Sequence, residues 1–273
     1  MFGRRILVLI PHPDDEVVGA ALAIRRAVAG GSAVFGLDLT HGCPPKETRW
    51  PWARARYQAR VDTRRREAAA AARALGLTRL ADDGLAAREL RHALPAAFQR
   101  VLAAVDAHAI DTLWVPAYEG AHADHDCANA LAFAATRARP GLAAWEFAEY
   151  NNAGQGRRGP RGAHAFPAPQ GGETALSLEG DEAHWKTDLL RLYRSEAFNL
   201  RNVGGNAALG ERFRPLPRHD YARPPHAGRL FYERFHWVPV PVPPLDRTTS
   251  AEVSAAIAAF LAAAPESTSS AAR

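Results

Sequence analysis

The sequence lacks the features that mark membrane-spanning, secreted and disulfide-stabilised proteins. No apolar run in its 273 residues approaches the roughly 20 residues that a helix needs to span a bilayer. The amino terminus leads directly into an apolar strand, so no secretory signal is indicated. The two cysteines, Cys43 and Cys127, are too few for a disulfide framework. These absences predict a cytoplasmic protein with reduced thiols and no transmembrane segment.

The sequence also lacks the signatures of dinucleotide binding and of base stacking. Its first strand and helix are not joined by a G-x-G-x-x-G motif, which removes the main support for a dinucleotide site. The net charge of +5 would attract phosphates, but the arginine clusters at residues 54–66 and 157–161 lack the regular interleaving of aromatic side chains that a base-stacking surface shows. We therefore expect solvated helix faces and no nucleic-acid partner, with an anionic group on a substrate or partner as the alternative.

Hydrophobic periodicity predicts an α/β fold. The hydrophobic content of 47% is sufficient for one large core. The apolar run Ile6–Ile10 has the length of a buried strand, residues 17–28 carry apolar side chains at helical spacing, and Ala33–Leu39 is a second apolar strand. A strand, helix and strand in this order imply parallel pairing with a right-handed crossover. We expect a mostly parallel sheet flanked by helices.

The rest of the chain is predicted to continue this alternation within a single domain, residues 1–265. Further strands are expected at about residues 112–115, 143–150 and 173–178, and further helices at about 57–75, 94–107, 181–193 and 253–261. Residues 43–56 are expected to form a long loop that could act as a lid. We expect residues 199–247 to be an irregular flap or small β addition and residues 266–273 to be a disordered tail.

A polar cluster follows the first strand. His12, Asp14, Asp15 and Glu16 lie at the turn between this strand and the first helix, where open α/β sheets place their ligands. Carboxylates packed this closely repel one another, so a positive charge is expected among them. A divalent metal ion fits that requirement.

A second cluster, residues 119–126, follows the strand predicted at 112–115. It includes His122, Asp124 and His125, and Asp124 is the expected N-cap of the next helix. If both strands are parallel members of one sheet, the two clusters meet at its carboxyl edge. His12, Asp15 and His125 would then give the two imidazoles and one carboxylate of a catalytic zinc site.

Two side chains would remain beside the metal without being needed as ligands. Asp14 could remove a proton from bound water, and His122 could stabilise an oxyanion or protonate a leaving nitrogen. This combination suits hydrolysis of an amide or an ester.

The two motifs, His12–Glu16 (HPDDE) and His122–His125 (HADH), resemble those of the PIG-L (LmbE-like) family of zinc-dependent N-acetylglucosaminyl deacetylases. The resemblance covers approximately residues 4–135. It implies a Rossmann-like fold, Zn²⁺ or another divalent metal as cofactor, and an N-acetylglucosamine conjugate as substrate. Tyr193–Glu196 (YRSE) departs from the Tyr-x-Ser-Gln pattern of many relatives, and this departure leaves the metal motifs intact.

The resemblance also implies roles for individual residues. The metal ligands correspond to His12, Asp15 and His125, and the general base corresponds to Asp14. His122 corresponds to the group that polarises the carbonyl or stabilises its oxyanion.

Two further positions match the family pattern. Asp124 corresponds to the acidic partner that orients a histidine, and Arg64 is similar to a substrate-binding arginine. From its position alone, Arg64 lies on the inward stripe of the helix predicted at 57–75, where a structural salt bridge is the alternative role.

The sequence thus predicts a metal-dependent hydrolase that removes an N-acetyl or other N-acyl group from a small-molecule amino-sugar conjugate. Two alternatives are a non-catalytic sugar-binding module of the same fold and a basic nucleic-acid or partner-binding protein. Asp14 and His122 favour the enzyme, because binding alone needs neither side chain. The sequence does not specify the oligomeric state.

Overall fold

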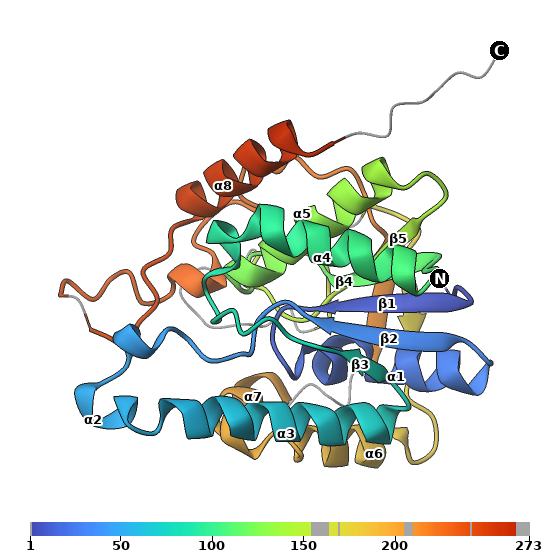
Figure 1. The fold of residues 1–273 in the computed structure, drawn as a ribbon, viewed down its shortest axis with the longest axis horizontal. Coiled ribbons are helices and arrows are strands. Elements are labelled where there is room, and N and C mark those ends of the chain that lie inside the picture. The colour runs from blue at the N-terminus through green and yellow to red at the C-terminus, as the bar shows by residue number, and fades with distance from the viewer. Residues whose placement is uncertain (1, 154–163, 169, 205–209, 241, 266–273) are drawn as a thin grey trace.

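A computed structural model describes residues 2–153, 164–168, 170–204, 210–240 and 242–265 (Figure 1). Its centre is a seven-stranded sheet with the order β3-β2-β1-β4-β5-β7-β6. The strands are β1 (Arg5–Ile10), β2 (Ala33–Asp38), β3 (Thr78–Leu80), β4 (Thr112–Pro116), β5 (Ala143–Phe147), β6 (Thr174–Leu176) and β7 (Glu211–Pro215). The first five strands are parallel, whereas β7 pairs antiparallel with both β5 and β6. The predicted fold class, a mostly parallel sheet of Rossmann-like type, is confirmed.

Helices cover both faces of this sheet (Figure 1). One face carries α1 (Asp15–Ala29), α3 (Tyr57–Leu75), α6 (Glu182–Leu190) and α7 (Ala197–Gly204), and the other carries α4 (Leu94–Ala107), α5 (Ala123–Ala138) and α8 (Ser250–Ala263). The connections contain α2 (Pro51–Arg54) and the 3₁₀ segments Lys46–Thr48, Leu90–His92, Arg194–Glu196 and Phe231–Glu233. Among the described helices, none has both the length and the apolar character needed to cross a membrane.

Burial on both faces explains the continuous apolar run of β1. Leu7 and Leu9 belong to the core on the α4 and α5 side, whereas Ile6, Val8 and Ile10 belong to the core on the α1 side. All five side chains are fully buried, as expected for a central parallel strand. The carboxyl end of β1 is therefore fixed deep within the molecule.

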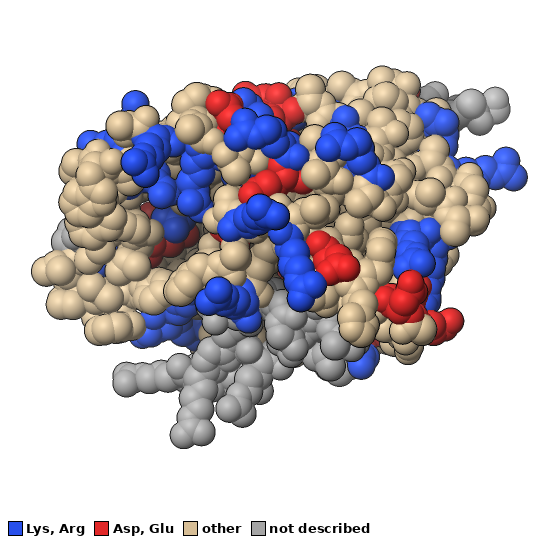
Figure 2. Space-filling model, turned by 90° about the horizontal axis from the view of Figure 1, so that it is seen from below, with Lys and Arg blue, Asp and Glu red and all other residues tan. Residues whose placement is uncertain are grey.

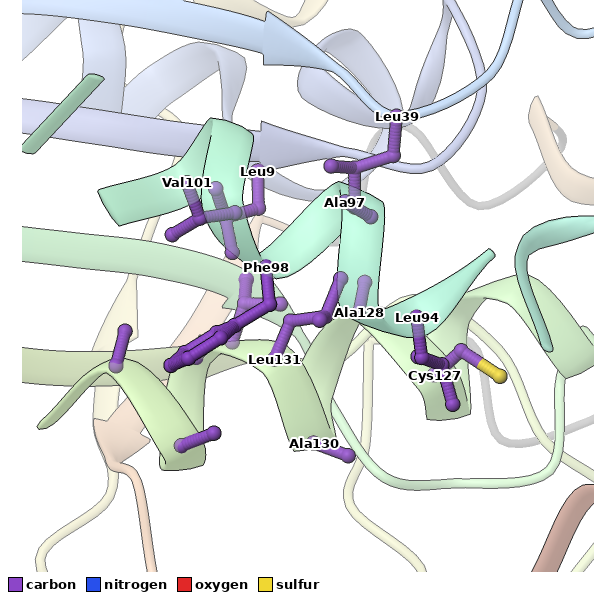
Figure 3. Packing of buried hydrophobic residues seen from close by; sticks show 14 of the residues in the cluster. Leu9, Leu39, Leu94, Ala97, Phe98, Val101, Cys127, Ala128, Ala130 and Leu131 are labelled. Atoms are coloured by element: carbon purple, nitrogen blue, oxygen red, sulfur yellow. The ribbon is translucent and has the colours of Figure 1, made fainter. Parts of the chain in front are cut away.

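The core on the other face joins α4 and α5 to the sheet. Figure 3 shows Phe98 and Val101 of α4 and Leu131 of α5 pointing into one cluster with Leu9 of β1. Ala128 of α5 is fully buried in the same cluster. This packing fixes α5, whose first turn carries the second polar motif, relative to β1, which precedes the first.

The helix predicted at residues 57–75 is α3. Its inward stripe includes buried Val61, Ala68 and Leu75, and Arg64 on the same stripe is 1% exposed. Gly76 ends the helix in the left-handed conformation, with φ of 72°, which glycine adopts without steric cost.

One local prediction was wrong. Asp124 is not the N-cap of α5, because the helix begins two residues earlier than expected and the cap is His122. The Nδ1 atom of His122 accepts a hydrogen bond of 3.1 Å from the backbone N–H of Asp124. Asp124 lies in the first turn instead, and its carboxylate is free to point toward the first cluster.

Two connections contain more structure than the sequence indicated. Residues 43–56, expected to be a long loop, include the 3₁₀ turn Lys46–Thr48 and the helix α2. Within residues 199–247, β7 joins the main sheet between β5 and β6. The tail predicted at residues 266–273 lies outside the described residues.

Candidate functional site

The sheet brings the two polar clusters together. β1 and β4 are adjacent and parallel, with Val8 opposite Trp114, so their carboxyl ends open at the same edge. The turn after β1 supplies His12, Asp14 and Asp15, and the turn after β4 with the start of α5 supplies His122 and His125. Residues more than one hundred positions apart in the chain therefore meet, as the spacing predicted.

Three side-chain atoms at this edge form a nearly equilateral triangle. The Oδ2 atom of Asp15 lies 3.4 Å from Nδ1 of His12 and 3.3 Å from Nε2 of His125, and these two nitrogens are 3.3 Å apart. Ligands about 2.0–2.1 Å from a tetrahedral zinc ion stand about 3.3–3.4 Å from one another. The residues present therefore fit a zinc ion, with a fourth ligand position left for water or substrate.

Each histidine of the triangle directs its other ring nitrogen at a carboxylate. The Nε2 atom of His12 is 2.9 Å from Oδ2 of Asp124, and Nδ1 of His125 is 3.9 Å from Oε2 of Glu149. Metal-binding histidines commonly donate their second ring N–H to such a group, which fixes the ring orientation. The expected orienting role of Asp124 thus has a specific partner, His12.

The charged groups of the cluster favour the binding of a cation. Burial lowers the pKa of His12, but Asp15 and Asp124 more than offset this effect and raise it to about 10. Burial raises the pKa of Asp15, yet His125 and His12 hold it well below its usual value. Without another positive charge, the carboxylates therefore retain a proton on His12, and a divalent ion can take the place of that proton.

Asp14 lies beside the triangle in a strained conformation. It precedes α1 with φ of 138°, a value that a residue with a side chain rarely adopts. Its Oδ2 atom is 3.4 Å from Nη1 of Arg64. Burial raises the pKa of Asp14 well above its usual value, and the charge of Arg64 opposes that shift. The arrangement suits a carboxylate that accepts a proton and returns it.

Arg64 is buried between two carboxylates. Besides Asp14, it contacts Oε1 of Glu196 at 3.6 Å, and its Nη2 donates to the carbonyl of Pro13 at 2.5 Å. A Cβ atom at Gly42 would lie 2.6 Å from this Nη2, so the guanidinium fills the space that glycine leaves. Arg64 therefore forms the structural salt bridge considered as its alternative role, and it also lines the cavity.

The hydrogen bonding of His122 indicates its tautomer. Because Nδ1 accepts from the backbone N–H of Asp124, the proton of the neutral ring is assigned to Nε2. Burial, followed by the charge of His12, lowers the pKa of His122 well below its usual value. A neutral ring with an Nε2–H donor at the cavity results.

A cavity of about 680 Å³ opens onto the cluster. His12, Asp14, Asp15 and His122 line it, whereas His125 and Asp124 stand behind them. Other lining residues include Arg49, Trp50, Arg60, Arg64, Arg88, Glu149, Tyr150, Glu196, Phe198, Phe231, Arg234 and Phe235. The volume is in the range of small-molecule sites.

The sequence did not identify Glu149 as a site residue. It had placed residue 149 inside a strand, but β5 ends at Phe147, so Glu149 lies just beyond the carboxyl end. Within the described part of the chain, neither its carboxylate oxygens nor Nδ1 of His125 has a hydrogen-bond partner. A rule that searches every strand end for carboxylates would have found it.

Glu16, for which the sequence required no catalytic role, belongs to a buried supporting network. Its carboxylate contacts Nη1 of Arg79 at 3.0 Å and accepts a hydrogen bond from the hydroxyl of Tyr193. Arg79 also forms a bidentate pair with Asp38 at the end of β2. The network links the first turn of α1 to β2 and to the segment after α6.

No curated protein matches the chain in sequence. Three solved structures share its fold. A deacetylase triple mutant (Orf2*T) of the teicoplanin biosynthetic pathway has a TM-score of 0.61 at 18% identity, over 79% of this chain and 99% of that chain. The A40926 pseudoaglycone deacetylase Dbv21 has a TM-score of 0.57 at 20% identity, over 78% and 96%. The zinc-inhibited form of teicoplanin deacetylase Orf2 has a TM-score of 0.56 at 18% identity, over 79% and 99%.

The sequence model of the PIG-L family, described as GlcNAc-PI de-N-acetylase, matches residues 7–136. This segment begins within β1 and ends within α5, so it contains both polar motifs and every residue of the triangle. Residues 7–136 therefore form a PIG-L family domain within this chain.

Proposed function

We propose that this protein is a metal-dependent hydrolase, with zinc as the expected ion, that removes an N-acetyl or other N-acyl group from an amino-sugar conjugate. One observation carries the proposal. A triangle of ligand atoms spaced for zinc shares a cavity with a carboxylate, Asp14, and an imidazole, His122, that the metal does not need.

A bound zinc ion would lower the pKa of water and polarise a carbonyl group. His12, Asp15 and His125 would hold it. Asp124 and Glu149 would orient the two histidines from behind, as their distances of 2.9 and 3.9 Å from the outer ring nitrogens suggest.

Asp14 performs the proton transfers in this proposal. Its carboxylate accepts a proton from the attacking water, whose oxygen forms the new bond to the amide carbon. The bond between this carbon and nitrogen then breaks, and the proton passes from Asp14 to the nitrogen. The products are the free amine and the carboxylic acid. Arg64, 3.4 Å from the carboxylate, keeps Asp14 in place through both transfers.

His122 acts as a hydrogen-bond donor. Its Nδ1 is occupied by the backbone N–H of Asp124, so Nε2–H is available at the cavity to stabilise the negative oxygen that develops on the attacked carbonyl. The same contact makes His122 the N-cap of α5, which fixes the ring before substrate binds.

The substrate class is supported by the comparisons. The family description names a de-N-acetylase of a glucosamine conjugate, and the similar structures are named as deacetylases of teicoplanin biosynthesis and of the A40926 pseudoaglycone. Acyl amino sugars on a larger conjugate are therefore the first substrates to test.

The test is amine release from a panel of N-acylated glucosamine glycosides. Protein dialysed against a chelator should be inactive, and activity should return in proportion to the zinc added. Turnover that a chelator leaves unchanged would contradict the proposal. Protein that binds zinc but releases no amine from any glycoside would instead be a sugar-binding module.

A further inference from the structure

The cavity has an excess of positive charge away from the ligand triangle. Five of its lining residues are arginines: Arg49, Arg60, Arg64, Arg88 and Arg234. Glu196 pairs with Arg60 at 2.7 Å and with Arg64 at 3.6 Å. Arg88 pairs with Asp246 at 3.4 Å, and Arg234 forms no ion pair with any residue that the structure describes.

The position of Arg234 is fixed by its neighbours. Its guanidinium carbon lies 4.1 Å from the ring centre of Phe231 and 4.7 Å from that of Phe235, and Nη1 donates to the carbonyl of Phe231 at 3.0 Å. The backbone N–H of Phe231 in turn donates to the carbonyl of Gly120 at 2.9 Å. The segment that carries Arg234 is thus attached to the loop between β4 and α5, which leads to the catalytic motif.

Contacts to Asp124 and Pro244 fix the position of Arg88. Its backbone N–H donates to Oδ2 of Asp124 at 2.6 Å, and its φ of 74° is unusual for a residue with a side chain. Nη1 and Nη2 donate to the carbonyl of Pro244 at 3.2 and 3.3 Å. A strained backbone that is tied to Asp124 therefore sets the direction of this guanidinium.

The two arginines repel each other. Partial desolvation lowers the pKa of Arg234, Tyr150 and Asp246 oppose this shift, and the charge of Arg88 adds to it. Like charges held near one another at a cavity wall are stabilised when an anion binds between them. Guanidinium groups are the side chains best suited to carboxylate and phosphate oxyanions.

The apolar part of the same wall is provided by Phe231 and Phe235, which also line the cavity. Tyr150 packs edge-to-face on Phe231 with ring centres 5.2 Å apart and lies 6.1 Å from the ring of His125. An aromatic surface therefore extends from the ligand triangle to Arg234.

We propose that the group joined to the amino sugar carries an oxyanion next to an apolar body, and that Arg234 and Arg88 bind this oxyanion against Phe231 and Phe235. The inference rests on the proposed hydrolase, because it concerns the part of that substrate which does not react. Arg234 is the specificity-determining residue.

Three matched N-acetylglucosaminides test this inference: the 4-carboxyphenyl, 4-phosphonophenyl and uncharged 4-carbamoylphenyl glycosides. The zinc-loaded enzyme should prefer a charged glycoside in kcat/KM by about tenfold to 100-fold, the usual effect of a charged hydrogen bond. Arg234→Gln should abolish the preference by lowering kcat/KM for the charged glycosides to the level of the carbamoyl compound. Whichever charged compound is preferred identifies the oxyanion as carboxylate or phosphate.

Arg229→Gln is the matched control, because it removes the same charge from the same segment at a residue that does not line the cavity. It should keep the full preference. An equal preference in wild type and Arg234→Gln, or none in wild type, would overturn the inference and leave the hydrolase intact.

If the enzyme hydrolyses none of the three, the hydrolase proposal fails, and calorimetric binding of the same glycosides decides the inference separately. Tighter binding of a charged compound that is lost in Arg234→Gln would support it. Equal binding of all three would refute it.

Discussion

The Oε2 atom of Glu149 lies 3.9 Å from Nδ1 of His125, with both side chains almost completely buried. The backbone of Glu149 is held on both sides, because its N–H donates to Glu119 at 2.8 Å and its carbonyl accepts from the N–H of His164 at 2.8 Å. The carboxylate therefore has little freedom to turn elsewhere. It faces the outer ring nitrogen of His125, as Asp124 faces that of His12, but at 3.9 Å instead of 2.9 Å.

This relationship predicts that Glu149 strengthens metal binding. Glu149→Gln keeps the shape but replaces the carboxyl group that faces Nδ1 of His125 by an amide, so the zinc affinity should fall by about 10-fold to 100-fold. Competition with a chromogenic chelator measures the affinity directly. Glu173→Gln, the same change at an exposed residue of the β6 segment, should leave it unaltered. Equal zinc affinity in wild type and Glu149→Gln, with equal thermal stability in chelator, would show that Glu149 does not support His125.

Asp14 and His125 should separate catalysis from metal binding. Asp14→Asn keeps a side chain that can accept from Arg64 but cannot take a proton, so it should retain zinc and lose about 10²-fold to 10⁴-fold in kcat. His125→Ala should lose zinc as well as activity, because it removes one corner of the triangle. Zinc content and amine release are measured on the same samples. Near wild-type turnover in both variants would exclude these roles.

His122 has two functions that one substitution can separate. As N-cap it accepts from the N–H of Asp124, and asparagine can make the same bond. His122→Asn should therefore preserve stability while moving the N–H donor away from the position of Nε2, which lowers kcat by about 10²-fold to 10³-fold. Thermal unfolding and steady-state kinetics test the two parts. An unchanged kcat in this variant would show that another group donates to the oxyanion.

A segment of the fold could be predicted where its local sequence determines its structure. The helix at residues 57–75 was predicted at its observed bounds, because an apolar stripe and a terminal glycine mark it. For residues 199–247 the sequence predicts only an irregular flap or small β addition, because Arg212 and Arg214 of β7 follow no local strand pattern. Arg214 is buried with its Nε 2.6 Å from Oε1 of Glu146 in β5, a partner 68 residues away.

The same distinction applies to the site. The residues of the triangle occur in two short motifs, each after an apolar strand, so parallel pairing was sufficient to predict that they meet. Glu149 enters the site from a segment whose sequence shows no motif, and Glu196 ends the Tyr193–Glu196 segment, to which the sequence assigned no role in the site. Their roles follow from tertiary distances to His125 and Arg64, which only the folded chain provides.

A buried ion pair on the α1 side should be important for stability. Nζ of Lys186 lies 2.6 Å from Oε1 of Glu211, with both side chains 0% exposed, and Glu211 also accepts from two backbone N–H groups of α1. Lys186→Met leaves this carboxylate buried and unpaired, so the free energy of unfolding should fall by about 3–5 kcal/mol.

The control for Lys186→Met is Arg191→Met. Arg191 pairs with Asp188 at 2.7 Å on the surface, where an ion pair contributes less than about 1 kcal/mol. Urea denaturation compares the two variants with wild type. A similar decrease in the free energy of unfolding in both variants would mean that burial does not determine how much the Lys186–Glu211 pair contributes to stability.

His164 predicts a specific dependence of stability on pH. Burial, followed by the charge of Lys186, lowers the pKa of this histidine from 6.5 to about 3. Between these values the unfolded chain binds a proton that the native protein does not, so the stability present above pH 6.5 is lost as the pH falls. From pH 7 to pH 5 this group alone should lower the free energy of unfolding by about 2 kcal/mol.

His164→Asn is suited to test this effect. Residue 164 has φ of 53°, which asparagine tolerates, and an amide does not titrate. The variant should therefore lose about 2 kcal/mol less than wild type between pH 7 and pH 5 in urea denaturation. Because the comparison takes the difference between the two proteins, the contributions of other groups that titrate between pH 7 and pH 5 cancel. Equal losses would show that native His164 binds its proton as readily as the unfolded chain does.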